Sequence, residues 1–421
     1  MNEGDGCMNK FFDMYVGLKK DCYILAFGRA VTSMGSLIWP MLTLILKSKL
    51  GYGAETIAQI FLIMGIVQLP MNLVGGKLAD CFSKKHLIVI FDIISILCFI
   101  ITGLLPLSMA SLCIYFVGSI FQQMESPSYD ALVADLTTSD QREKAYSLNY
   151  LAMNFGIVLS PIIGGLLFKD YLNLAFIISG ISISFSTILI FFFIHPVNQI
   201  KEQTNSIYES EFAGSAFSFL KARKILLLYF IISALGSVIY SQFNFLMPLH
   251  LEAIFFEDSA FYFGILTSIN AFVVVACTPL LTKWMQGLMD ISKNMIGFIF
   301  EVGALSCFMF ITNQYFVICI LMVFFTFGEI SMTLGNIPYV TRRIPSTHRG
   351  RIIALVGIFA SLFTSFSNLI VGKLVEMYSL AFVWRGIALF GLISVILFVF
   401  YMRLDKKSFL LLYEGNKSTK E

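Results

Sequence analysis

Charged residues are scarce in this 421-residue chain, since Asp, Glu, Lys and Arg together make up only 13% of it. Soluble globular proteins usually carry about 25% charged residues, so this chain has too few to cover a water-facing surface of its size. Hydrophobic residues make up 57%, and Phe alone contributes 43 residues. The composition excludes an ordinary soluble domain and indicates a protein that is embedded in lipid.

Motifs for catalysis, nucleotide binding and metal binding are also missing. The eight Cys are scattered without a CxxC pair, and no two of the four His stand at ligand spacing. We therefore expect no disulfide framework, no metal site and no cofactor. The chain has no nucleotide-binding loop and no Ser-His-Asp arrangement, which argues against an enzyme and against an ATP-driven pump. The net charge of +3 gives no indication of a nucleic-acid partner.

Long apolar runs occupy most of the chain. A helix that spans a membrane needs roughly 20 mainly apolar residues, and twelve stretches meet this requirement. They lie near residues 22–45, 55–78, 87–106, 111–132, 146–168, 172–194, 225–250, 261–282, 295–312, 315–338, 352–377 and 381–402. Lipid offers the backbone no hydrogen bonds, and the runs do not alternate as barrel strands do. The pattern therefore predicts an all-α membrane protein with twelve transmembrane helices.

A polar stretch divides these spans into six and six. We predict an N-terminal six-helix bundle over 1–194, a cytoplasmic linker over 195–224, and a C-terminal six-helix bundle with a cytoplasmic tail over 225–421. A weak internal repeat supports two similar bundles, because Thr137–Leu148 aligns with Ile344–Leu355 at an offset of 207.

The distribution of Lys and Arg predicts the orientation. With a cytoplasmic N-terminus, 23 of the 29 Lys and Arg residues fall in inside segments, five fall in outside segments, and Arg29 lies within a span. Cytoplasmic loops of membrane proteins carry an excess of Lys and Arg. Both termini are therefore expected in the cytoplasm.

The loop between the second and third spans reads GGKLADCFSKK, over Gly75–Lys85. It resembles the loop signature of the major facilitator superfamily, Gly-x-x-x-Asp-Arg-x-Gly-Arg/Lys-Arg/Lys. The matching residues are Gly76, Asp80, Lys84 and Lys85, and the departures are Cys81 and Ser83. We expect Gly76 to allow close contact between helices, and Asp80 to cap a helix end or to pair across the two halves.

The fifth span contains GIVLSPIIGG, over Gly156–Gly165. It resembles the antiporter signature of the same superfamily, Gly-x-x-x-Gly-Pro-x-x-Gly-Gly. The matching residues are Gly156, Pro161, Gly164 and Gly165, and Ser160 replaces a Gly. Pro161 is expected to bend the helix and the glycines to let a neighbouring helix approach closely. In the family this signature goes with export by exchange of substrate for protons.

Nearly the whole chain resembles the bacterial multidrug/proton antiporters of this superfamily. The resemblance implies the major facilitator fold, a cavity lined by spans 1, 4, 7 and 10, and a place in the bacterial cytoplasmic membrane. The implied partners are a small-molecule substrate, protons and lipid, for a protein that acts as a monomer. The resemblance also implies a membrane acid at Glu329, which is present, and acids where Asn149 and Asn244 stand.

Ionisable side chains within the spans are expensive and by default indicate function. Glu125 and Glu329 lie closest to the expected middle of the bilayer. Asp92 and Glu301 lie nearer to a cytoplasmic end, and we expect them to pair with loop cations.

Residues three and four apart share one side of a helix. On this spacing Glu125 shares a face with Gln122, Ser126 and Tyr129, and Glu329 with Thr326, Thr333 and Asn336. The candidates for proton coupling and the substrate cavity are Arg29, Gln122, Glu125, Asn149, Tyr240, Asn244, Glu329 and Asn336.

Two functions remain open. Proton-driven export of amphipathic organic compounds is favoured by the resemblance, and by Phe and Met residues that give an adaptable apolar pocket. The alternative is transport of one defined solute, such as a sugar, peptide or lipid precursor, which Asn149 and Asn244 favour because both stand where acids are expected. Glu329 either pairs with Arg29 or exchanges its proton during transport, and we expect the second.

Overall fold

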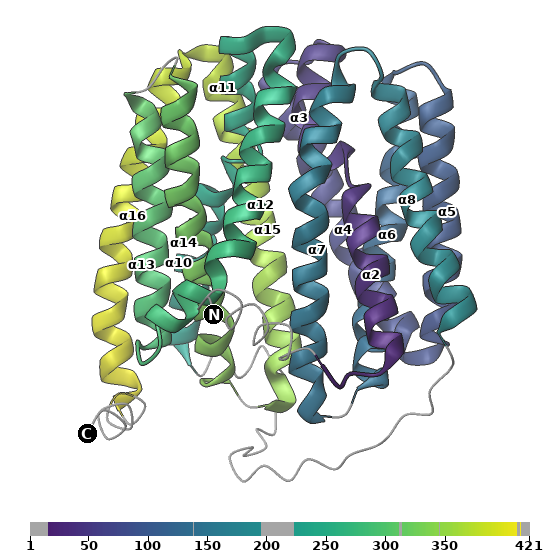
Figure 1. Ribbon diagram of the computed structural model, residues 1–421. Helices are drawn as coiled ribbons and strands as arrows, with labels where there is room; N and C mark the ends of the chain where they lie inside the picture. The colour runs from purple at the N-terminus through teal and green to yellow at the C-terminus, as the bar shows by residue number, and fades with distance from the viewer. Residues whose placement is uncertain are drawn as a thin grey trace, which may run out of the picture. The chain divides into compact units, whose positions relative to one another are not determined.

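The computed structural model describes residues 16–137, 139–194, 223–310, 314–344, 346–410 and 413. Within these ranges the chain is folded almost entirely into helices (Figure 1). The prediction of an all-α protein is therefore confirmed for the described part of the chain. The predicted linker 195–224 lies outside it, except for Arg223 and Lys224.

Long helices follow one another through both halves of the chain. The first half contains α2 (Lys20–Met34), α3 (Ile38–Leu44), a π-helix (Ile45–Lys49), α4 (Ala54–Cys81), α5 (Lys84–Leu104), α6 (Met109–Leu136), α7 (Ser139–Phe168) and α8 (Leu172–Phe193). The second half contains α10 (Lys224–Ser241), α11 (Leu246–Phe255), α12 (Ser259–Trp284), α13 (Asp290–Ser306), α14 (Tyr315–Thr341), α15 (Ser346–Met377) and α16 (Leu380–Ser408), with 3-10 turns after α11 and α13. Nine helical stretches of the described residues are long and apolar enough to cross a membrane. Helices α6 and α13 are not among these nine, and each carries a buried Glu, Glu125 and Glu301.

Two predicted spans are each interrupted, and in both a proline follows the break. The span predicted at 22–45 is divided into α2 and α3, and the span predicted at 225–250 into α10 and α11. Pro40 and Pro248 each stand third in the new helix, within the first turn, where a missing N–H costs nothing. Pro248 cannot bond the carbonyl of Asn244, which instead accepts a hydrogen bond from Thr43 Oγ1 at 3.0 Å.

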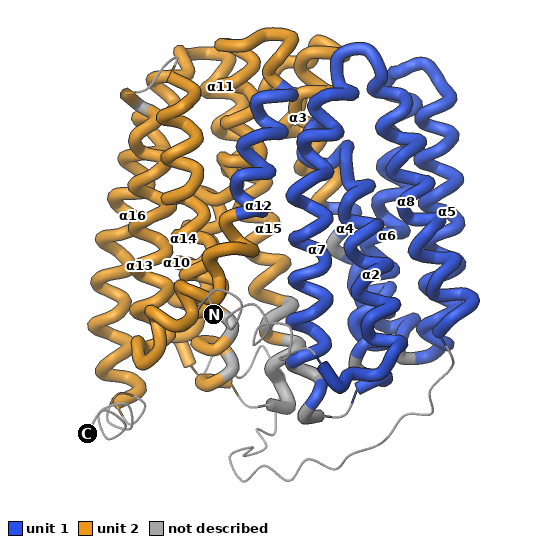
Figure 2. Tube along the Cα trace, in the orientation of Figure 1, with its two compact units in different colours: residues 1–42, 66–203, 260–272 blue, residues 43–65, 204–259, 273–421 orange. Residues whose placement is uncertain are grey.

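The chain is organised as two compact units (Figure 2). Unit 1 contains residues 1–42, 66–203 and 260–272, and unit 2 contains residues 43–65, 204–259 and 273–421. In unit 1, α5 packs against α6 and α8, and α2 packs against α7 and α8. In unit 2, α13 packs against α14 and α16, and α10 packs against α15 and α16.

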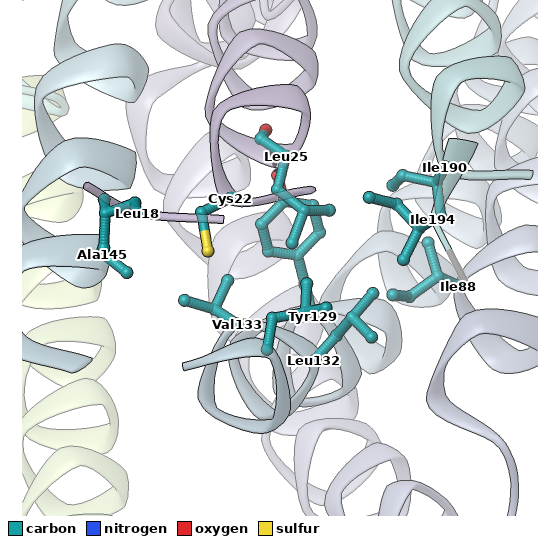
Figure 3. Packing of buried hydrophobic residues seen from close by; sticks show 11 residues of the cluster. Leu18, Cys22, Leu25, Ile88, Tyr129, Leu132, Val133, Ala145, Ile190 and Ile194 are labelled. Atoms are coloured by element: carbon teal, nitrogen blue, oxygen red, sulfur yellow. Dashed lines mark hydrogen bonds between the residues drawn. The ribbon is translucent and has the colours of Figure 1, made fainter. Parts of the chain in front are cut away.

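A hydrophobic cluster joins five helices within unit 1 (Figure 3). Its buried members are Leu18, Cys22, Leu25, Ile88, Tyr129, Leu132, Val133, Leu136, Ala145, Ile190 and Ile194. The hydroxyl of Tyr129 donates to the carbonyl oxygen of Leu25 at 2.5 Å. This bond fixes Tyr129 of α6 against α2, and so ties the two helices together beside the polar cavity of the unit.

A buried ion pair anchors the end of α14 to α16 in unit 2. Arg343 Nη2 lies 2.9 Å from Asp405 Oδ2, and the two side chains are 2% and 0% exposed. Tyr339 donates to Asp405 Oδ1 at 2.6 Å and also shares a hydrogen bond with Tyr401. A carboxylate withdrawn from water needs this many partners, because its desolvation is otherwise not repaid.

The close helix contact expected at Gly76 occurs one residue earlier. A Cβ atom at Gly76 would meet no heavy atom of the described part of the chain within 4 Å. A Cβ atom at Gly75 would lie 2.8 Å from Met124 Cα and 2.9 Å from its carbonyl carbon. The role assigned to Gly76 is therefore wrong, because the face of α4 that touches the α6 backbone is the one that carries Gly75.

The two glycines provide a matched pair of variants. Gly75→Ala is expected to lower the free energy of unfolding by about 1–3 kcal/mol, since the added methyl meets backbone that cannot move aside. Gly76→Ala is expected to be neutral or slightly stabilising, because alanine favours a helix over glycine. Thermal unfolding of the detergent-purified proteins measures both. Equal melting temperatures for the two variants would contradict the assignment.

Candidate functional site

A polar cavity of about 350 Å³ lies within unit 1. It is lined by α2, α3, α4, α5, α6 and α8, and most of its lining side chains carry hydroxyl, amide or charged groups. The predicted face of α6 contributes to it throughout, because Gln122, Glu125, Ser126 and Tyr129 all line this cavity. The spacing of three and four residues therefore identified a real cavity wall.

Arg29 brings the only cationic side chain among the described residues that line this cavity. Its guanidinium carbon lies 4.8 Å from the centroid of the Tyr129 ring, at cation–π distance. Glu125 is 7% exposed, and the charged groups that act on it are Asp92, Arg29 and Asp130. Within the described residues no carboxylate oxygen lies within 4.0 Å of Arg29. Its positive charge therefore acts on Asp92 and Glu125 at longer range, without forming an ion pair with either.

Asp92 belongs to this cluster, and the expectation that it pairs with a loop cation is wrong. Its side chain is 6% exposed, lines the cavity with Arg29 and Glu125, and accepts a hydrogen bond from Thr187 Oγ1 at 2.7 Å. Sequence position alone placed it close to a helix end. The missing information was the contact between α5 and α8, which brings Thr187 to it.

A second group of polar residues lies inside unit 2. Tyr240 of α10 donates to Glu329 Oε1 of α14 at 3.1 Å. Two turns further along α14, Asn336 accepts a hydrogen bond from Tyr229 at its Oδ1 at 2.6 Å. Tyr229 in turn accepts from Asn294 Nδ2 at 2.9 Å. The structure thus joins two of the predicted residues, Tyr240 and Glu329, and places a third, Asn336, two turns further along α14. Tyr229 and Asn294 were not among the residues predicted from the sequence.

Asn149 and Asn244, the two residues expected to replace family acids, have separate surroundings. Asn149 is 9% exposed, and its Nδ2 donates to the carbonyl of Ala145, one turn earlier in α7. Asn244 is exposed and lies in the break between α10 and α11. Asn149 lies in unit 1 and Asn244 in unit 2.

The lysines of the loop signature connect helix ends within unit 1. Lys84 Nζ lies 2.5 Å from Asp135 Oδ2 on α6, and Lys85 Nζ donates to the carbonyl of Ile194 at 2.7 Å. Both Nζ atoms thereby lie at the C-terminal ends of α6 and α8, where the helix dipole is negative. The side chain of Asp80, the remaining polar member of the signature, lies outside the described residues.

The antiporter signature of α7 places backbone against backbone on two sides. Cβ atoms at Gly156 and Gly164 would meet the α2–α3 region, at 2.8 Å from Met34 N and 2.9 Å from Leu37 O. A Cβ atom at Gly165 would lie 2.7 Å from Ala260 O of α12, and Pro161 faces Gly264 of the same helix. All these residues belong to unit 1. The small residues of the signature therefore allow two neighbouring segments to touch α7.

Residues 25–300 match the Major Facilitator Superfamily, which is about two thirds of the chain. The chain belongs to this superfamily. A Na(+), Li(+), K(+)/H(+) antiporter of Planococcus maritimus is 22% identical over 353 residues, which covers 76% of this chain and 80% of the relative. The quinolone resistance protein NorA of Staphylococcus aureus is 27% identical over 167 residues, 39% of this chain and 42% of NorA. The chain is thus a multi-pass membrane transporter and not an enzyme.

Solved structures show the same fold. A peptide transporter POT in complex with sulfate has a TM-score of 0.74 at 14% identity, covering 93% of this chain and 95% of that chain. The nucleoside transporter NupG has a TM-score of 0.73 at 14% identity, covering 90% and 98%. At this identity the likeness concerns the fold alone.

Arg29 is expected to stabilise the unit 1 acids, and a double-mutant cycle tests this. Arg29→Met should cost about 1–3 kcal/mol of stability, less than the loss of one partner of a fully buried pair, because Arg29 is only half-buried. Adding Glu125→Gln removes one of the acids left without a cation, so the double variant should be more stable than Arg29→Met alone. Thermal unfolding of the purified proteins measures the cycle, and additive losses would contradict the interaction.

Proposed function

We propose that this transporter exports cationic amphipathic organic compounds in exchange for protons. The observation that carries the proposal is the charge of the unit 1 cavity. One guanidinium, Arg29, and two carboxylates, Asp92 and Glu125, leave a net charge of −1 when both acids are ionised. One proton brings this charge to zero.

Antiport requires that the substrate and the proton exclude each other. A charge of −1 in a cavity enclosed by protein attracts one cation, and a proton on either acid removes that attraction. A cationic substrate and a proton therefore compete for the same charge. The predicted antiporter signature of α7 supports this direction of exchange, as does the partial similarity to a quinolone resistance protein.

A second candidate is the exchange of one defined solute, a monovalent metal cation, for protons. It is favoured by the lining of the cavity, where hydroxyl and amide groups outnumber aromatic rings. Oxygen ligands of this kind suit hard cations. The similarity to the Planococcus maritimus antiporter points the same way over three quarters of the chain.

The proposed arrangement has twelve spans, with α2–α3 and α10–α11 each counted as one. The two bundles correspond to residues 1–194 and 225–421, joined by the cytoplasmic linker 195–224, with both termini in the cytoplasm of a bacterial cell. Gln122 and Asn149 are assigned to the substrate path in unit 1, and Tyr240, Asn244, Glu329 and Asn336 to that in unit 2. Asp80 and the glycines of α7 are assigned to the change of conformation.

Glu125 and Glu329 are the acids whose loss should uncouple transport. In everted membrane vesicles with an imposed pH gradient, Glu125→Gln and Glu329→Gln should each reduce cation-driven proton release by about tenfold or more. The physical reason is that an amide cannot exchange a proton. A pH-sensitive dye reports proton release on addition of ethidium, NaCl or KCl, and the responding cation separates the two candidates.

The matched control is Asp170→Asn, which removes an exposed carboxyl group beyond the end of α7. Its proton release should equal that of the parent. Proton release that survives intact in both Glu variants would refute their assignment. A parent protein that releases no protons with any of these cations would refute antiport itself.

A further inference from the structure

Two Glu residues approach each other inside unit 2, where α13 and α14 are in backbone contact. A Cβ atom at Gly297 would lie 2.5 Å from Gly328 O, and a Cβ atom at Gly328 would lie 2.6 Å from Gly297 O. Only glycine fits at either position. Glu301 stands one turn after Gly297, and its Cγ would lie 2.7 Å from a Cβ atom at Gly328, whose neighbour in the chain is Glu329.

Glu301 is withdrawn from solvent and incompletely bonded. Its side chain is 1% exposed, and within the described part of the chain its Oε2 has no hydrogen-bond partner. The charged group that acts on it is Glu329. The expectation that Glu301 pairs with a loop cation is therefore wrong. A buried carboxylate oxygen without a partner costs free energy, so it calls for a proton or a cation.

The helices packed against α13 bring no cation to this pair within the described residues. On α13 itself, Asp290 and Lys293 lie two turns or more away and contact each other at 3.8 Å. Arg342 and Arg343 lie just beyond the end of α14, where Arg342 bonds Asp290 and Arg343 bonds Asp405 of α16. The remaining charged or titratable groups on α10 and α16 are Lys224, Tyr229, Tyr240, Arg385, Tyr401, Arg403, Lys406 and Lys407, and the last two are exposed. The side chains of Lys224, Arg385 and Arg403 are exposed, and Tyr240 bonds Glu329 directly.

From this geometry we infer that Glu301 and Glu329 share a single proton and together form the proton-binding site of unit 2. The inference rests on the proposed proton exchange and names the acid that Glu329 works with. Two carboxylates on helices in backbone contact, in a medium of low dielectric constant, cannot both stay ionised. Since Tyr240 donates to Glu329, Glu329 is the favoured ionised member. The proton then resides on Glu301, where it turns the unpartnered oxygen into a donor.

A polar route continues from the pair along the same two helices. Asn294 precedes Glu301 by seven residues and Asn336 follows Glu329 by seven, so each amide lies two turns, about 10 Å, from its acid. Tyr229 bridges the two amides. Asn294 is 1% exposed, and its Oδ1 also has no partner within the described residues. When a proton leaves the pair, these groups are the next polar atoms inside the unit that can bind it.

Infrared titration of the purified full-length protein in nanodiscs tests the pair without any transport. The parent protein should show a protonated-carboxyl band at neutral pH that both Glu301→Gln and Glu329→Gln change. In Glu301→Gln the remaining Glu329 has lost its like-charged neighbour, so its band should disappear at least about one pH unit lower than the parent band. Glu329→Gln should give the reciprocal result. A pH-indicator count should show one proton lost, not two, in the double variant.

The matched control is Glu257→Gln, an exposed Glu between α11 and α12, which should leave the band unchanged. Two separate bands, each removed by one variant with the other unmoved, would overturn the pair. Absence of a protonated-carboxyl band from the parent protein at neutral pH would overturn the proton as the occupant of the pair. Because the band is measured without substrate, it decides the pair even if vesicle assays reject antiport. If one single variant does not fold, the other gives the same test.

Discussion

A bilayer supplies neither water nor mobile ions to a buried polar group, and this constraint determines how the side chains inside both units are arranged. Hydroxyl groups meet it locally. Ser95, Thr102 and Ser179 each bond the carbonyl one turn earlier in their own helix. Carboxyl groups cannot do this, because they need donors or a cation from other helices. The positions of the carboxyl groups therefore determine which helices must pack closely.

Close packing is provided by residues with little or no side chain. Gly75 lets α4 touch α6 next to Glu125, and Gly328 lets α14 touch α13 next to Glu329. Gly75 and Glu125 lie on helices in contact, and Gly328 directly precedes Glu329 in the chain. Proline has a complementary part, since Pro248 leaves the carbonyl of Asn244 to a side-chain donor. Small residues and prolines thus position the polar groups without bonding to them.

The sequence predicted the helices well because their signal is long apolar runs, which depend only on local composition. It also predicted the α6 face with Gln122 and Glu125, because the period of a helix is fixed. It failed for Asp92 and Glu301, because the groups around them come from other helices. The periodicity of one helix does not reveal which helices it will contact. Glycine function was misplaced by one residue, from Gly75 to Gly76, since a motif gives spacing but not which side of the helix faces the neighbour.

The two units hold their acids by different means. In unit 1, Arg29 provides a permanent positive charge beside Asp92 and Glu125, so part of the negative charge is neutralised without any ligand. In unit 2, no cation of the described residues acts on Glu301, and Tyr240 offers only a neutral hydroxyl to Glu329. A fixed counter-charge leaves room for an exchangeable cation of any size that the cavity admits. Two Glu residues in backbone-tight packing admit only a small occupant, and a proton is the smallest.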